Sequence, residues 1–66
     1  MSSLEERIIT YVEGTGSFPE TSREIAEALD VPHSTITASL RRLESRGLVR
    51  KLGVSFSGAH TWGVAG

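Results

Sequence analysis

Apolar residues recur at intervals of three and four positions in three stretches of the chain, which is the spacing of one buried helix face. The pattern predicts helices over residues 4–13 and 22–29, and from residue 32 or 33 to residue 46. The expected inward-facing residues are Leu4, Ile8, Tyr11 and Val12 in the first helix, Ile25, Ala26 and Leu29 in the second, and Ile36, Leu40 and Leu43 in the third.

Residues typical of helix ends support these boundaries. Two capping boxes of the form S/T-x-x-E precede the first two helices, at Ser3 with Glu6 and at Thr21 with Glu24. The run Gly14-Thr15-Gly16 is expected to stop the first helix. The sequence therefore predicts both where each helix starts and why it starts there.

The chain after the third helix has the pattern of a β-hairpin. Gly47 stands where a left-handed C-terminal cap is needed. Residues 48–52 and 61–64 predict two strands, joined by a segment rich in Gly and Ser. A short additional strand is expected near Phe18 and Pro19, with Phe18 folded back onto the core.

The segment between the second and third helices has the spacing of a helix-turn-helix. Ala26 is small enough to let the two helices cross closely, and Asp30, four positions later, is able to adopt a left-handed backbone. Ile36 and Leu40 follow at the positions that pack the third helix against the second.

Residues 29–37 and 47–51 resemble the winged helix-turn-helix of MarR-like and ArsR-like bacterial regulators. The resemblance covers roughly residues 4–64. It departs from the family at Asp30, where most members have glycine.

This resemblance implies an α+β, mostly helical fold, in which three helices are followed by a two-stranded β-hairpin wing. It implies one domain over residues 1–66, with the helix-turn-helix at about residues 21–46 and the wing at about residues 48–64. The implied function is transcriptional regulation by sequence-specific binding to duplex DNA, with the third helix in the major groove and the wing on the backbone.

A narrower resemblance exists to the Zα domains, which bind left-handed nucleic acid and also have a wing tryptophan. The third helix aligns with theirs without a gap from Pro32 onward. Those domains have lysine, asparagine and tyrosine where this chain has His33, Thr37 and Arg41, so binding to Z-form duplexes is disfavoured. Trp62 is expected to pack in the core, with direct nucleic-acid contact as the alternative.

Length and composition limit the other classes of protein. A chain of 66 residues has a core worth only about 3 to 5 kcal/mol, so oligomerisation is a natural expectation. The chain has no cysteine and two histidines, which cannot complete a tetrahedral zinc site by themselves. The N-terminus has no apolar signal region, and no apolar run is long enough to span a bilayer, so we expect a cytoplasmic protein that does not contact membranes.

Charge is divided unevenly between the two halves of the chain. Residues 1–30 have two basic and seven acidic side chains, a net charge of −5, whereas residues 31–66 have five basic and one acidic, a net charge of +4. The sum is the −1 of the whole chain. Because the basic half contains the third helix and the wing, this division favours a DNA-facing surface with an acidic back, although an uneven scatter of charge by chance would look the same.

The exposed side of the third helix is the expected site of DNA contact. The expected DNA-binding residues of this helix are His33, Ser34, Thr35, Thr37, Ala38, Arg41 and Arg42. Hydroxyls and amides of the first turn are expected to contact phosphate, while Thr37, Ala38 and Arg41 lie over base edges and Arg42 serves either role. In the alternative, the hydroxyls only cap the helix and the arginines only face solvent.

Arg50 and Lys51, on the strand that leads into the wing, are also expected to bind DNA, at the sugar-phosphate backbone or in the minor groove. Strand alternation predicts that they point in opposite directions. The alternative is that they are charges that keep an edge strand soluble. Ser55, Ser57 and His60 are further candidates to donate hydrogen bonds to phosphate.

Catalysis is not expected, because no strained nucleophile turn, phosphate-binding glycine loop or metal-binding cluster is present in the sequence. The main alternative to DNA regulation is a protein-interaction module, in which Arg41 and Arg42 pair with acidic residues of a partner. Another is DNA binding in replication, recombination or packaging. A homodimer on DNA would form through the first helix and Tyr11. We expect no cofactor, no metal and no small-molecule ligand.

Overall fold

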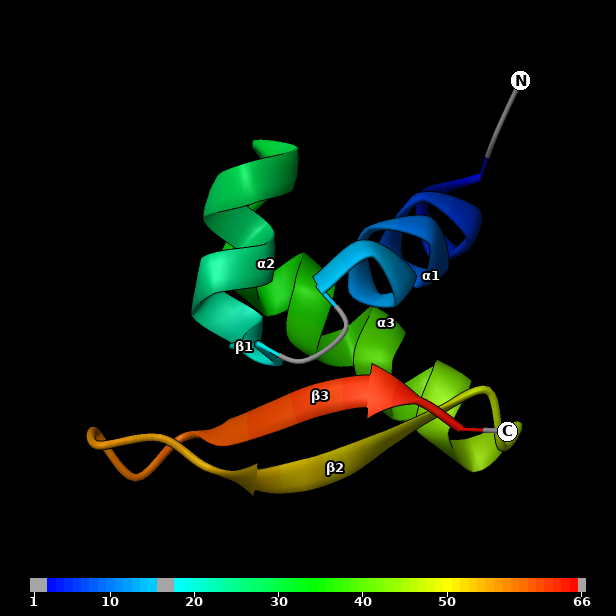
Figure 1. Cartoon of the computed structure of the whole chain (residues 1–66). Helices are drawn as coiled ribbons and strands as arrows, with labels where there is room; N and C mark the ends of the chain where they lie inside the picture. The colour runs from blue at the N-terminus through cyan, green and yellow to red at the C-terminus, as the bar shows by residue number, and fades with distance from the viewer. Residues whose placement is uncertain (1–2, 16–17, 66) are drawn as a thin grey trace.

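The computed structural model describes residues 3–15 and 18–65. In chain order the elements are α1 (Leu4–Thr15), β1 (Glu20–Thr21), α2 (Ser22–Leu29), α3 (His33–Ser45), β2 (Val49–Val54) and β3 (His60–Val64). The strands form one antiparallel sheet in the order β1-β3-β2. Figure 1 shows the helices gathered above the sheet and the β2–β3 hairpin extending past them at the left. The predicted fold of three helices and a hairpin wing is confirmed, and β1 adds a third strand.

Helix α1 begins where it was predicted and ends two residues later than expected. The amide of Glu6 donates to the Ser3 hydroxyl at 3.1 Å, as in the first half of a capping box. The helix continues through Gly14 to Thr15, whose hydroxyl donates to the carbonyl of Val12 at 2.8 Å. This bond satisfies a carbonyl of the last turn, so the glycine does not stop the helix.

Helix α2 has the predicted bounds, and its caps account for both ends. Thr21 and Glu24 form the complete capping box, with hydrogen bonds of 3.2 Å and 2.9 Å. At the other end Asp30 adopts the left-handed conformation, at φ 57° and ψ 48°. The amide of Val31 then donates to the carbonyl of Ala26 at 3.0 Å, which is the long bond of a Schellman motif.

Helix α3 ends in the same way. Arg46 is its C-cap, and Gly47 follows in the left-handed region at φ 76°. The amide of Leu48 donates to the carbonyl of Leu43 at 2.9 Å. Both helices of the helix-turn-helix are therefore closed by one left-handed residue, as the sequence predicted.

The core lies between the helices and the sheet. One position on α3 was not predicted to be buried: Ser39, which is fully enclosed together with its apolar neighbours. Hydrophobic spacing does not identify such a residue, because the pattern counts only apolar side chains. The buried apolar residues are Ile8, Val12, Ile25, Ala26, Ile36, Leu40, Leu43, Val49 and Trp62, with Leu4, Ile9, Tyr11, Leu29 and Val31 packed against them.

The expectation that Phe18 folds back onto the core is wrong, because its side chain is 81% exposed. The amide of Phe18 donates to the carbonyl of Thr15 at 2.9 Å in the turn that leaves α1. Trp62, paired with Glu20 in the sheet, is the aromatic residue that joins the core in this region. The short additional strand expected near Phe18 and Pro19 is present, at Glu20–Thr21.

The wing is a hairpin with one irregularity. Its pairing runs from Val49 opposite Val64 to Val54 opposite His60, and shifts between Lys51 and Gly53. Such a bulge increases the local twist of the hairpin. Among residues 3–15 and 18–65, no helix is both long and apolar enough to cross a membrane.

Candidate nucleic-acid interface

The outer side of α3 is a ridge of exposed side chains. The opposite side of the helix is buried through Ile36, Leu40 and Leu43. Because successive residues of a helix are rotated by about 100°, the positions farthest from the core can be assigned from the sequence numbers. These positions, here called the α3 ridge, are Ser34, Ala38, Arg41 and Ser45, and all four are exposed. Small side chains surround a single arginine, a shape that permits close approach to a groove.

His33 and Thr37 lie beside the ridge, on the flank that faces α2. The His33 ring nitrogen Nε2 is 2.8 Å from the hydroxyl of Ser22, the first residue of α2. The Thr37 hydroxyl donates to the carbonyl of His33 at 3.0 Å and lies 3.5 Å from Nε2. Ser22 was not among the predicted site residues, because no local motif connects it with a histidine eleven positions away.

Arg42 lies on the other flank, which faces α1. Its Nε is 4.0 Å from Oε2 of Glu5, and the same oxygen is 3.6 Å from Nη1 of Arg46. The Arg42 guanidinium also donates to the hydroxyl of Ser39 at 3.3 Å. Arg41 and Arg42 therefore differ in position: Arg41 is on the ridge, whereas Arg42 is held toward the acidic helix. The sequence did not identify Glu5 as a partner.

The first turn of α3 has open hydroxyls and amides. Ser34 and Thr35 are exposed. The N-cap is Pro32, and no side chain of the described residues caps this helix. The amides of Thr35 and Ile36 donate to the Pro32 carbonyl, at 3.0 Å and 3.1 Å. Capping by the two hydroxyls, the alternative considered from the sequence, is therefore not what the described part of the chain shows.

Arg50 and Lys51 are both exposed but have different surroundings. Lys51 pairs with Trp62 in the sheet, and its Nζ lies 5.7 Å from the centre of the indole ring. Arg50 pairs with Gly63 and lines an open hollow that also contains Glu13 of α1. Since neighbouring strand residues point to opposite faces, the two cations are presented on different sides of the wing. Trp62 itself is buried, so its expected role in packing is confirmed.

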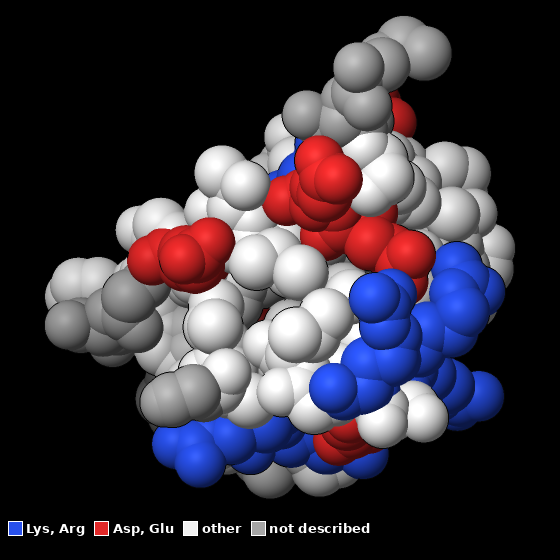
Figure 2. Space-filling model, turned by 90° about the vertical axis from the view of Figure 1, so that its right-hand side faces the viewer, with Lys and Arg blue, Asp and Glu red and all other residues white. Residues whose placement is uncertain are grey.

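Charge on the surface follows the division seen in the sequence. Figure 2 shows Lys and Arg along the right and lower edges of one face and Asp and Glu mainly over its upper part. Arg41, Arg42 and Arg46 meet Glu5 around one open hollow at the C-terminal half of α3. The boundary between the acidic and basic regions therefore passes between α1 and α3.

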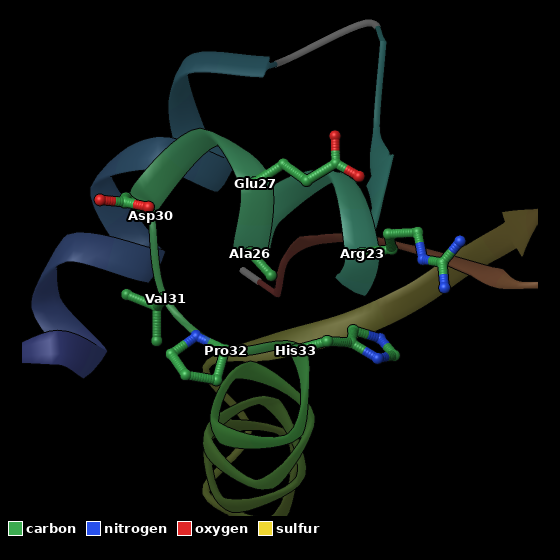
Figure 3. Close-up of a pocket in the computed structure, with 7 residues that line it drawn as sticks. All are labelled: Arg23, Ala26, Glu27, Asp30, Val31, Pro32 and His33. Atoms are coloured by element: carbon green, nitrogen blue, oxygen red, sulfur yellow. The ribbon is translucent and has the colours of Figure 1, made fainter.

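A third hollow, of about 570 Å³, is open at the turn between α2 and α3. Figure 3 shows Arg23 and His33 directed to one side of it and Asp30 to the other. Arg23 thus adds a positive charge near the first turn of α3, where the helix dipole also favours anions. Within residues 3–15 and 18–65, no three side chains of His, Cys, Asp or Glu are grouped so as to hold a metal ion.

The outer part of α1 contains Tyr11, the residue expected at a dimer contact. Its hydroxyl donates to Oε1 of Glu20 at 2.6 Å. This hydrogen bond to a carboxylate, with smaller contributions from burial and from nearby negative charge, raises the pKa of Tyr11 above its ordinary value of 10.0. Tyr11 therefore serves a structural contact between α1 and β1.

The family model of TrmB, described as a sugar-specific transcriptional regulator, matches residues 17–55, more than half of the chain. No curated protein is similar enough to count as a match.

Three solved structures are similar in fold. MepR, a transcription regulator of the Staphylococcus aureus multidrug efflux pump MepA, has a TM-score of 0.86 and 22% identity, over 98% of this chain and 47% of MepR. The S. aureus MepR–DNA complex has a TM-score of 0.85 and 20% identity, over 98% of this chain and 47% of that one. The transcriptional regulator PA3341 has a TM-score of 0.72 and 28% identity, over 96% of this chain and 47% of that one.

The chain spans about half the length of each of these structures. Their likeness confirms the winged helix-turn-helix that the sequence predicted, and the family match extends over the helix-turn-helix and all of β2. The chain therefore belongs to the TrmB family of sugar-specific transcriptional regulators, and its fold is a winged helix-turn-helix.

Proposed function

We propose that this chain binds duplex DNA with the α3 ridge in the major groove, and that Ala38 and Arg41 read base edges there. The observation that supports this proposal best is the ridge itself, an exposed line of small side chains with one arginine. Arginine commonly pairs with guanine, and an alanine methyl can contact the methyl group of thymine. A solved complex of MepR, which has a similar fold, with DNA supports DNA binding by this fold.

Phosphate contacts follow from the first turn of α3. Ser34 and Thr35 are exposed and are not used as caps. A helix N-terminus attracts anions through its open amides and its dipole, so these two residues are assigned to a DNA phosphate. His33 and Thr37 border the same region and are assigned to adjacent contacts. The hydrogen bond of His33 to Ser22 fixes the ring beside the ridge.

Arg42 is assigned to phosphate rather than to a base, because its side chain is directed toward α1. Its pair with Glu5 is long and exposed, and pairs of this kind contribute about 0 to 1 kcal/mol. Exchange of Glu5 for a DNA phosphate therefore involves little loss. Arg46, which shares the same carboxylate, is a further phosphate contact that the sequence did not predict.

In the wing, Lys51 is assigned to the sugar-phosphate backbone. Arg50 is assigned there as well, although the nearby Glu13 offers it a competing partner. Each phosphate contact of this kind releases a counterion and adds to the salt dependence of binding.

The test is fluorescence anisotropy of a labelled duplex over a range of salt concentrations. Arg41→Ala is expected to weaken binding by about tenfold or more, the discrimination that one good base contact provides. Arg41→Ala with Arg42→Ala is expected to remove most binding, and Lys51→Ala to reduce the salt slope by about one.

The control is Arg7→Ala, which removes one positive charge from the acidic half of the chain, where Arg7 donates to the carbonyl of Leu29 at 3.2 Å. Binding that does not change with salt, or an Arg41→Ala variant that binds as well as Arg7→Ala, would contradict the proposal.

A further inference from the structure

The tip of the wing presents an aromatic side chain that the fold does not use. Phe56, between β2 and β3, is completely exposed, and Val54 beside it is largely exposed. Because the core already contains Trp62 and needs no further aromatic residue, packing within the chain does not explain Phe56. From this residue and its setting we propose that Phe56 is an apolar wedge that enters the minor groove of the DNA duplex bound by α3.

The turn that carries Phe56 is well ordered by hydrogen bonds. The amide of Ser55 donates to the carbonyl of Ala59 at 2.8 Å, and the amide of Gly58 donates to the carbonyl of Ser55 at 3.0 Å. Gly58 has a positive φ of 85°, as required after a type I turn in a three-residue hairpin loop. The hydroxyls of Ser55 and Ser57 are 2.8 Å apart, on either side of Phe56 in the sequence. The backbone that carries Phe56 is thus held in a short, defined turn, which reduces the backbone entropy lost when the ring inserts.

The wing is long enough to reach the minor groove. From Val49, which is buried in the core, to Phe56 is seven residues, or about 23 Å at 3.3 Å per strand residue. Adjacent major and minor grooves are separated by about half a helical turn of B-DNA, roughly 17 Å. A wing anchored beside α3 can therefore cross one phosphate backbone.

The charge of the wing favours DNA, rather than a protein, as the partner that Phe56 contacts. The sequence has no acidic residue after Glu44, so the whole wing approaches a polyanion without repulsion. Lys51 lies on the same hairpin and supplies a cation. Apolar wedges are a known way to read the minor groove, because they partly unstack a base step and favour steps that deform easily. Phe56 would in this way add a preference for flexible pyrimidine–purine steps, such as TA, next to the bases read by α3.

This inference rests on the proposed function, and its test separates the two. Binding is measured by anisotropy on two duplexes of equal length, one rich in TA steps and one G·C-rich, with 2-aminopurine at a central step to report unstacking. Phe56→Ala is expected to weaken binding to the TA-rich duplex by about tenfold, to leave the salt slope unchanged and to abolish the rise in 2-aminopurine fluorescence. Phe56→Leu, which keeps an apolar wedge, is expected to retain most of both effects.

The matched control is Phe18→Ala, which removes another strongly exposed aromatic residue far from the wing tip in the sequence. Thermal unfolding of each variant shows whether the fold is retained, which is expected because both side chains are exposed. If Phe56→Ala binds like the parent while Arg41→Ala does not, the wedge is refuted and the proposed function stands. Failure of the parent chain to bind either duplex refutes both. Sedimentation in which Phe56→Ala alone converts a dimer to a monomer also overturns the wedge, since it assigns the ring to a second copy.

Discussion

Glu5 holds Arg42 of α3 and Arg46, the C-cap of that helix, toward α1, and neutralising Glu5 is expected to move stability and DNA affinity in opposite directions. Its Oε2 atom lies 4.0 Å from Arg42 and 3.6 Å from Arg46, whose side chains are 63% and 62% exposed. Exposed pairs contribute about 0 to 1 kcal/mol each, and because these two share one carboxylate oxygen we take about 1 kcal/mol for both together. Glu5→Gln keeps the shape of the side chain and removes this attraction.

The size of both effects follows from that limit. Unfolding should become easier by less than about 1 kcal/mol, which lowers the Tm of a domain of this size by no more than about 4 to 8 °C. DNA affinity should rise by up to about fivefold at low salt, because the guanidiniums of Arg42 and Arg46 no longer have to leave the Glu5 carboxylate before they bind a DNA phosphate. Differential scanning fluorimetry measures the first quantity, and duplex anisotropy the second.

Glu6→Gln is the matched control, since it removes the same charge one residue away on α1, where the side chain is exposed. Both variants lose one charge that repels DNA, so the difference between them isolates the two ion pairs. If Glu5→Gln and Glu6→Gln raise the affinity equally, or if Glu5→Gln lowers it, the assignment of Arg42 and Arg46 to phosphate is refuted.

Two further predictions concern the fold. Gly63→Ala should destabilise the wing by about 1 to 3 kcal/mol, because a Cβ at this position would overlap the side chain of Leu52, whose Cγ would lie only 2.9 Å from it. In urea denaturation, the double variant with Leu52→Ala should recover part of this loss. If the effects of the two substitutions simply add, the overlap is not the cause. The free energy of unfolding should fall as the pH rises above about 10, because the hydrogen bond to Glu20 raises the folded-state pKa of Tyr11 above 10.0 and folding therefore favours the neutral phenol. Urea denaturation from pH 8 upward should show this decline in the parent and a smaller one in Tyr11→Phe. Equal profiles of the two proteins would contradict the prediction.

Local chemistry accounts for the parts of the fold that the sequence predicted well. Thr21 with Glu24 starts α2, and Asp30 ends it, because caps and left-handed residues act within a few positions of themselves. Phe18 could not be placed in the same way. Trp62, a residue distant in sequence, joins the core beside β1, whereas Phe18 is exposed, and no local motif distinguishes these two aromatic residues.

The candidate site divides along the same line. Helical spacing was sufficient to predict that Arg41 is exposed, because the rotation per residue alone places Arg41 on the side of α3 opposite the core. Helical spacing could not distinguish the surroundings of Arg41 from those of Arg42, because Arg42 is drawn toward Glu5, which lies on another helix. In the same way, Ser22 became a partner of His33 only once α2 and α3 were packed together.

The division of charge between the acidic and basic halves has a kinetic consequence. With −5 in residues 1–30 and +4 in residues 31–66, the domain has a large dipole moment despite a total charge of only −1. In the field of a DNA duplex such a molecule is rotated before contact, so that productive encounters are more frequent than random tumbling allows. Added salt should therefore slow association, because it weakens the torque that aligns the protein during its approach.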